Sequence, residues 1–228
     1  MHSDPTWLHR SALAERHFRA GEFAECRSLI VALQADGVDT PLARIALAAM
    51  DARQGDDASA TKHLLQIEKM NGVTAQLLVI AGRLYLRLKR PRDAIRLLEA
   101  AIERDSGLGS AYDAMAVACL LTRDLSGALF HAQEAVSREP NSYDSQYHLG
   151  LVFVRQGRHD EAIEAFKASV GLAAPGDGAS AHRRLADLLD HKGDRAFALH
   201  HRAQSYRPDR MTRLPWLDGG GTSEGPSL

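Results

Sequence analysis

The chain has 228 residues, of which 45% are hydrophobic and 25% are charged, and its formal net charge is −1. This composition is typical of a water-soluble globular protein, and the near-zero net charge gives no general attraction to nucleic acid or to acidic lipid. The first ten residues contain no apolar run of signal-peptide length, and no stretch approaches the ~18 apolar residues of a membrane-spanning helix. We therefore expect a cytoplasmic protein with no membrane span.

An N-terminal extension is expected over residues 1–6, and from Trp7 onward the chain repeats a pattern with a period of 34 residues. The pattern restarts at residues 41, 75, 109 and 143, and after a two-residue shift at 179. Two antiparallel helices approach closely only where neither carries a bulky side chain, so columns of small residues predict a helix pair in each repeat. Such residues fill the eighth position (Ala14, Ala48, Gly82, Ala116, Gly150, Ala186) and the twentieth (Cys26, Ala60, Ala94, Ala128, Ala162, Ala198).

Glycine separates the two predicted helices in four of the repeats. Glycine supplies the left-handed residue that commonly ends a helix, and here it stands at Gly21, Gly55, Gly157 and Gly193. We expect six repeats, over residues 7–40, 41–74, 75–108, 109–142, 143–178 and 179–212.

Residues 213–228 are rich in Gly, Ser and Pro, which predicts a flexible C-terminal tail. Its short apolar cluster, Leu214, Trp216 and Leu217, is expected to need a cover in water. One interpretation is that this cluster caps the last repeat at an edge made by Phe197 and Tyr206. The other is that it occupies a binding groove of the same chain or of a neighbouring copy, which would allow self-association through the tail.

The repeat resembles the tetratricopeptide repeat family, whose signature is W-x2-L-G-x2-Y, then A-x3-F, then P. The best copy is the segment 147–153, YHLGLVF, followed by 162–166, AIEAF. The resemblance implies an all-α fold, a right-handed α-solenoid of about six helix-turn-helix repeats. Departures from the signature are His17 and Asp51 at the eleventh position, and Arg202 where an apolar residue is usual. The second helix of the last repeat is otherwise polar, as a solvent-facing end requires.

In the family, the first helix of each pair lines a concave groove. Its exposed positions here are unusually apolar, which favours an amphipathic helix or an extended apolar segment as the bound partner. The predicted partner-binding residues are Arg53, Val79, Arg83, Leu86, Arg87, Val117, Leu120, Tyr147, Leu151 and Arg155, with Ile45, Ala49, Leu121 and Val154 on the same face. The alternative is that the assignment is one helical step off and that these side chains belong to the core.

The thirteenth position repeats arginine at Arg19, Arg53, Arg87 and Arg155, with Leu121 interrupting the series. These arginines could meet acidic groups of a bound segment, or they could form an ordinary solvated surface. Residues 83–92 are also basic, but they are too few and contain too little interleaved aromatic character to predict nucleic-acid binding. The Lys and Asn residues with which chaperone adaptors of the family bind acidic carboxyl termini are absent from the matching positions.

Asp187, Asp190 and His191 lie at i, i+3 and i+4 of one predicted helix and could converge on a metal ion. Arg183 and Arg184, one turn away, would repel a cation, and we expect no metal, no other cofactor and no catalytic residue. His200 and His201 are expected to face solvent without pairing. Cys26 and Cys119 fall in packing positions and are expected to be small buried side chains in a reducing compartment.

These observations predict a non-enzymatic adaptor or scaffold that captures a peptide or helix of a partner protein in its groove. One alternative is a dedicated chaperone for a secretion or pilus subunit, whose aggregation-prone segment the apolar groove would shield. Another is a helper subunit of an enzyme, or a weak metalloenzyme that uses Asp187, Asp190 and His191.

Overall fold

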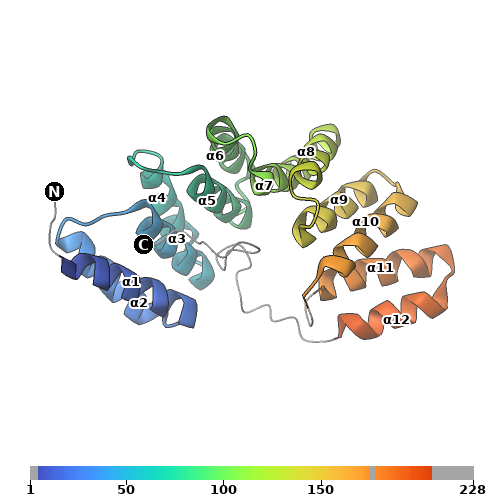
Figure 1. The fold of residues 1–228 in the computed structure, drawn as a ribbon, viewed down its shortest axis with the longest axis horizontal. Helices are drawn as coiled ribbons and strands as arrows, with labels where there is room; N and C mark the ends of the chain where they lie inside the picture. The colour runs from blue at the N-terminus through green and yellow to red at the C-terminus, as the bar shows by residue number, and fades with distance from the viewer. Residues whose placement is uncertain (1–4, 175–177, 207–228) are drawn as a thin grey trace. The chain divides into compact units, whose positions relative to one another are not determined.

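The computed structural model describes residues 5–174 and 178–206, and within these ranges it contains twelve α-helices and no strand (Figure 1). The predicted all-α class is therefore confirmed. The helices follow one another as six consecutive helix-turn-helix repeats along the chain. They are α1 (Pro5–Ala20), α2 (Phe23–Ala35), α3 (Pro41–Gln54), α4 (Asp57–Ile67), α5 (Ala75–Arg87), α6 (Pro91–Arg104), α7 (Gly109–Leu121), α8 (Leu125–Arg138), α9 (Tyr143–Arg155), α10 (His159–Leu172), α11 (Ala179–Lys192) and α12 (Arg195–Ser205).

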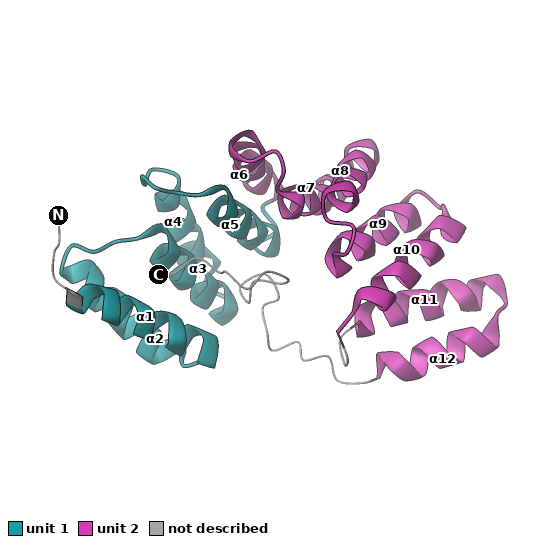
Figure 2. Cartoon of the chain, viewed as in Figure 1, with its two compact units in different colours: residues 1–90, 215–228 teal, residues 91–214 magenta. Residues whose placement is uncertain are grey.

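The chain divides into two compact units (Figure 2). Unit 1 contains α1 to α5, and unit 2 contains α6 to α12. Within the described residues, no helix is both long enough and apolar enough to cross a membrane. The predicted tail, with Leu214, Trp216 and Leu217, lies outside the described residues.

Local sequence signals fix where the helices begin. Thr40 accepts a hydrogen bond from the backbone N–H of Ala43 at the start of α3, and Ser142 accepts one from Ser145 at the start of α9, each over 3.2 Å. Thr74 caps α5 in the same way. A side-chain oxygen at this position satisfies one of the N–H groups that a helix start leaves without an internal partner.

The turn between the two helices of each repeat has the same backbone conformation, whether or not glycine occupies it. Gly55 and Gly193 end α3 and α11 with φ of 80° and 86°. The equivalent residues of the third and fourth repeats are Lys89 and Arg123, which also have positive φ, 56° and 64°. The glycines of the other repeats therefore mark a conformation that the packing imposes even on residues with a Cβ atom.

The small residues at the eighth and twentieth positions of the repeat form the contact inside the helix pairs. The twentieth-position residues are all fully buried, and those at the eighth position are buried as well. The helices pack against each other in the pairs α1–α2, α3–α4, α7–α8, α9–α10 and α11–α12. At Gly150 a Cβ atom would lie 2.7 Å from Cε1 of Phe166, so α9 and α10 approach too closely there for any side chain.

Asp51, one of the departures from the signature, is held in a polar network inside unit 1. Its carboxylate is buried and lies 2.6 Å from the Arg27 guanidinium and 3.5 Å from Nε2 of His63. Arg44 then donates to Nδ1 of His63 over 3.1 Å. His17, the other departure, pairs with Glu22. Polar residues at this position thus lie beside charged or polar partners instead of packing as an aromatic ring would.

The last helix, α12, is weakly anchored. Ala198 is its single buried residue among those described, while Phe197, Leu199 and Tyr206 are exposed. Arg202 pairs with Asp190 of α11 instead of entering a core.

Candidate functional site

The ten residues predicted to contact a partner divide evenly between the two units. Those of unit 1 lie on α3 and α5, and those of unit 2 lie on α7 and α9. The unit 1 set is Arg53, Val79, Arg83, Leu86 and Arg87, and the unit 2 set is Val117, Leu120, Tyr147, Leu151 and Arg155.

In unit 1 the apolar part of the prediction falls in the core. Val79 is only 4% exposed, and Ile45 and Ala49 are also buried, so none of the three is accessible to a partner. Leu86 is half-buried. For these helices the alternative interpretation, that the apolar positions pack internally, describes the structure better.

The arginines of unit 1 remain at its surface. Arg53 and Arg87 are exposed, and Arg83 is half-buried. The Arg53 guanidinium lies 5.1 Å from the centre of the Phe23 ring, which fixes its position by a cation–π contact. Partial burial and the nearby charge of Arg53 lower the pKa of Arg87. Arg53 of α3 and Arg87 of α5 are therefore close enough for their charges to interact.

In unit 2 the predicted residues are all exposed or half-buried. We call Val117, Leu120 and Leu121 of α7, with Tyr147, Leu151, Val154 and Arg155 of α9, the α7–α9 face. Leu121 is 52% exposed, Arg155 is exposed, and the other members are half-buried. Residues four apart lie on one side of a helix, and α7 packs against α9, so we expect the two groups of side chains to lie near one another.

The α7–α9 face rests on a rigid base. The ring of Tyr147 stacks on Tyr143 with centroids 6.0 Å apart and planes inclined by 7°, and it also contacts Phe166 of α10 at 5.6 Å. Leu151 and Val154 pack partly against the same core. Tyr147, Leu151 and Val154 therefore pack partly on the core and keep the rest of their side chains exposed to solvent.

A buried polar contact that the sequence interpretation did not predict joins the two helices of this face. Nδ1 of His148 on α9 lies 2.6 Å from Oδ1 of Asp113 on α7, and Asp113 is buried. An acid in the middle of the apolar segment 109–121 was the available signal, because a buried carboxylate requires a partner.

In the sixth repeat the first helix, α11, has polar side chains at its surface. Arg183 and Asp187 are exposed there, Asp190 pairs with Arg202, and Nδ1 of His191 lies 3.1 Å from the backbone oxygen of Asp187. Across residues 5–174 and 178–206, no three His, Cys, Asp or Glu side chains are grouped closely enough to hold a metal ion. Asp187, Asp190 and His191 are therefore not grouped closely enough to hold a metal ion.

His201 was expected to face solvent without pairing, and this expectation is wrong. Its Nδ1 lies 2.8 Å from Nδ1 of His182 on α11. His200 is exposed, as expected.

Neither cysteine is an activated nucleophile. Burial raises the pKa of both the Cys26 and the Cys119 thiol to about 11, so both stay protonated at neutral pH. Both are free and buried, in agreement with their predicted packing role.

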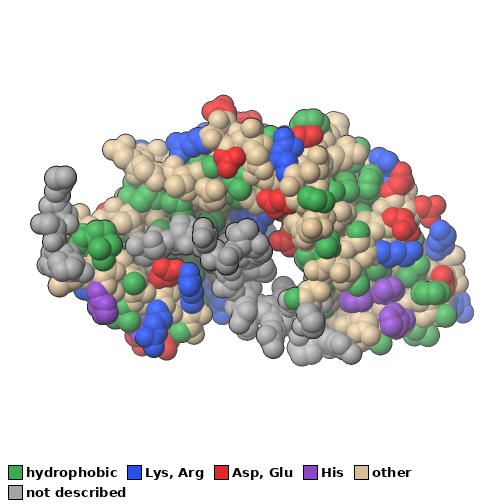
Figure 3. Space-filling view, in the orientation of Figure 1, with side chains coloured by type: hydrophobic (Ala, Val, Ile, Leu, Met, Phe, Trp, Pro, Cys, Tyr) green, Lys and Arg blue, Asp and Glu red, His purple; other side chains and the backbone are tan. Residues whose placement is uncertain are grey.

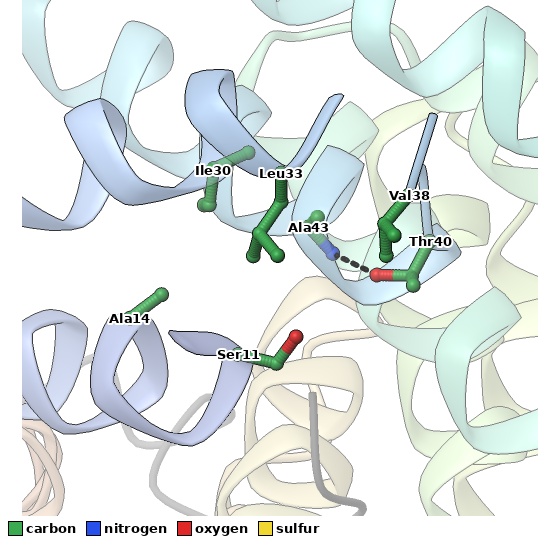
Figure 4. Close-up of a pocket in the computed structure, with 7 residues that line it drawn as sticks. All are labelled: Ser11, Ala14, Ile30, Leu33, Val38, Thr40 and Ala43. Carbon is green, nitrogen blue, oxygen red and sulfur yellow. Dashed lines mark hydrogen bonds between the residues drawn. The ribbon is translucent and has the colours of Figure 1, made fainter. Parts of the chain in front are cut away.

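A small cavity lies between α1, α2 and α3 of unit 1 (Figure 4). Its volume is about 10 Å³, which is the space of a single water molecule. Apolar side chains and the hydroxyls of Ser11 and Thr40 line it. The cavity is a packing gap and is too small for an organic ligand.

Comparison with known proteins agrees with the repeat architecture. The family model described as tetratricopeptide repeat matches residues 81–129 and 122–179. No curated protein matches the chain in sequence.

Solved structures resemble the chain, some over more than 90% of its length. PilW, described as a widely conserved type IV pilus biogenesis factor, has a TM-score of 0.74 at 16% identity, covering 95% of this chain and 98% of PilW. PilF of Pseudomonas aeruginosa has a TM-score of 0.71 at 14% identity, covering 92% of this chain and 94% of its own. MamA has a TM-score of 0.57 at 24% identity, covering 70% of this chain and 92% of its own. At these identities the likeness shows the fold, a right-handed α-solenoid of helix pairs.

Proposed function

We propose that the chain, whose residues 81–129 and 122–179 match the tetratricopeptide repeat model, is a non-enzymatic adaptor or scaffold that captures a peptide or helix of a partner protein. The binding surface we propose is the α7–α9 face of unit 2. The observation that carries the proposal is that apolar side chains of α7 and α9 stay partly exposed, with Leu121 52% exposed, while Tyr147, Leu151 and Val154 of α9 also pack on the core.

The chemistry of the face favours an apolar segment with acidic neighbours. A partner that covered Leu121, Leu151 and Tyr147 would remove their remaining apolar surface from water, which contributes ~25 cal/mol per Å². The Arg155 guanidinium at the edge could then bind a carboxylate. Because the Tyr143 stack and the core already hold Tyr147 in place, little side-chain entropy would be lost on binding.

The arginines of α3 and α5 are proposed as a second contact, for acidic groups of the partner. Arg53 is held over Phe23, and its charge lowers the pKa of Arg87. A carboxylate that bound there would relieve the repulsion between the two guanidinium groups. Val79 is omitted from the proposed site because it is buried.

A role without catalysis is supported by the state of the reactive groups. Proteins of this family are generally non-catalytic scaffolds. Both thiols are buried with raised pKa, and the buried carboxylates Asp51 and Asp113 are paired with Arg27 and His148. The free buried cysteines also support the reducing cytoplasm as the location, which fractionation of the native cell would check.

A second candidate is a chaperone for a pilus or secretion subunit. The observation that favours it is the likeness to PilW and PilF, each matched over more than 90% of its length. In this candidate function the same α7–α9 face would bind an apolar helix, and the helix would need no acidic residues. Binding that Arg155→Ala leaves unchanged, while apolar substitutions remove it, would favour this candidate over the acidic partner.

Selection of displayed peptides on the wild-type protein tests the proposal. The peptide library includes both amphipathic helices and extended segments, and the enriched sequences are re-measured against Tyr147→Ala/Leu151→Ala. We expect the double variant to lose binding while its circular dichroism spectrum remains helical. Binding retained by the folded double variant would place the site elsewhere.

A further inference from the structure

The linker between α4 and α5 of unit 1 contains an asparagine followed by a glycine, Asn71–Gly72. Both residues are exposed and form a turn, and the linker lies at the surface of unit 1 in the space-filling view (Figure 3). Gly72 has φ of 76°, and apart from its chain neighbours no atom lies within 4 Å of the place a Cβ atom would take there. The space around the Gly72 backbone is therefore open.

The backbone nitrogen of Gly72 is also free of hydrogen bonds. The N–H groups of Lys69 and Met70, just before it, donate back to carbonyl groups at the end of α4, each over 3.0 Å. Within residues 5–174 and 178–206, by contrast, the Gly72 N–H has no acceptor. Water alone can satisfy such a group, so no protein contact holds this nitrogen away from the Asn71 side chain.

We propose that Asn71–Gly72 is a self-modification site, at which the folded protein slowly loses the side-chain amide of Asn71 as ammonia. The Gly72 nitrogen attacks Cγ of Asn71 and gives up its proton. The bond between Cγ and the side-chain nitrogen breaks, and ammonia leaves with that proton. The product is a five-membered succinimide ring. Glycine favours the attack because it has no side chain to hinder the approach of its nitrogen.

Water then opens the ring at one of its two carbonyl carbons. Addition at Cγ restores the normal main chain and leaves aspartate at position 71. Addition at the main-chain carbonyl carbon leaves the chain running through the side chain, as isoaspartate. Over both steps one water is consumed and one ammonia is released, with no oxidation and no cofactor. Either product carries a carboxylate where the neutral amide was.

The chain has one other asparagine, and its neighbour is held. Asn141 is also exposed in a turn, but the N–H of Ser142 donates to the backbone oxygen of Glu139 over 3.1 Å. Ser142 is also the residue that caps α9, through its bond from Ser145. Attack on Asn141 would break the hydrogen bond to Glu139, so we expect this asparagine to react far more slowly.

The modification would alter the junction of the second and third repeats. Isoaspartate adds one methylene group to the main chain of the linker, which ends at Thr74, the residue that caps α5. Helix α5 packs against α3 and carries Arg83 and Arg87. The modified protein would therefore differ from the original in charge and in the path of the chain that leads into α5. The site is separate from the α7–α9 face of unit 2.

Timed incubation of the full chain at pH 7.4 and 37 °C, followed by peptide mapping with mass spectrometry, tests the proposal. Every protein carries Ser142→Gly, so that both asparagines precede a glycine, and glycine is a tolerated residue at a helix cap. We expect Asn71 to convert faster than Asn141 by a factor of about ten or more, because only the Gly72 nitrogen is unbonded. Both aspartate and isoaspartate should appear at position 71.

Two controls separate the effect of the fold from that of the sequence. The same protein incubated in guanidinium chloride should convert both asparagines at similar rates, because unfolding frees both nitrogens. In the folded protein, Gly72→Ala should slow the conversion of Asn71 by a factor of about ten or more, because the added Cβ atom hinders the attack. This variant has space for the Cβ atom, and circular dichroism checks that it folds.

Three results would overturn the proposal. One is an Asn71 that stays intact in the folded protein while the denatured chain converts it. Another is equal conversion of Asn71 and Asn141 in the folded protein. The third is a rate at Asn71 that Gly72→Ala leaves unchanged.

Discussion

His148 of α9 and Asp113 of α7 are joined by a hydrogen bond of 2.6 Å in which the carboxylate is buried and the imidazole is half-buried. The contact joins two successive first helices of unit 2, the same helices that carry the face that we propose binds a partner. A buried carboxylate without its partner is costly, so this pair fixes how α9 sits against α7.

A double-mutant cycle on this pair should show strong coupling. His148→Ala alone should destabilise unit 2 by ~1–3 kcal/mol, because Asp113 then loses a hydrogen-bond partner in a buried place. Asp113→Ala with His148→Ala should cost less than the sum of the two single substitutions. Chemical denaturation measures all four proteins, and strictly additive losses would show that the pair contributes no specific interaction.

Substitution by alanine at two glycines of unit 2 should change its stability in opposite directions. Gly150→Ala places a Cβ atom 2.7 Å from Phe166, so it should overpack the contact and cost ~1–3 kcal/mol. Gly171→Ala meets no atom within 4 Å and should instead stabilise α10, by up to ~1 kcal/mol, because alanine is the better helix former. Melting temperatures that moved in the same direction for both would contradict the close approach of α9 and α10.

The turn inside each repeat offers a second matched pair. Gly157 has φ of 74° with no atom within 4 Å of an added Cβ, so the cost of Gly157→Ala, about 1 kcal/mol, is purely conformational. Arg123, at the equivalent position, already bears this strain at φ of 64°. Arg123→Gly should therefore be neutral or stabilising by a few tenths of a kcal/mol. A clear loss of stability on Arg123→Gly would mean that its side chain makes an essential contact.

Lowering the pH should reduce the stability of unit 1, because His63 binds a proton more readily in the unfolded chain than in the folded one. Burial lowers its pKa below the ordinary 6.5, with the charge of Arg44 acting in the same direction and that of Asp51 opposing it. Because Arg44 donates to Nδ1, the folded ring is neutral, whereas the unfolded ring takes up a proton once the pH falls below 6.5. The unfolded state then binds more protons, so the free energy of unfolding falls as the pH drops from 6.5 towards the folded pKa.

Urea denaturation at pH 7.5 and 5.5 measures this dependence. His63→Gln should flatten it, and His191→Gln, on the exposed surface of α11, should keep the parent slope. An unchanged slope in His63→Gln would assign the acid sensitivity to other groups.

The repeat pattern predicts the fold well because it encodes contacts inside each helix pair. Ala162 and Ala128 are fully buried where the small columns place them, and helices α5, α7 and α9 begin where the period restarts. Such contacts depend on residues a fixed distance apart in the sequence, so periodicity detects them.

The binding face was less predictable because exposure depends on what packs over a helix, and the repeat does not encode that. Val79 and Tyr147 both occupy the fifth position of their repeats, on α5 and α9, yet the first is buried and the second is half-buried. Contacts between separate helices are hidden for the same reason. His182 and His201 lie 19 residues apart, and nothing in their spacing indicates that their nitrogens meet.

The most direct test of the central claim compares two exposed apolar residues of unit 2. Leu121 on α7 is 52% exposed within the α7–α9 face, and Phe130 on α8 is 57% exposed outside it. Calorimetric titration of a peptide selected on the wild-type protein should give an affinity at least tenfold weaker for Leu121→Glu, a loss of about 1.4 kcal/mol or more. Phe130→Glu should bind as the wild type does. Equal affinity of Leu121→Glu and wild type, or a loss confined to Phe130→Glu, would contradict a partner-binding site on the α7–α9 face.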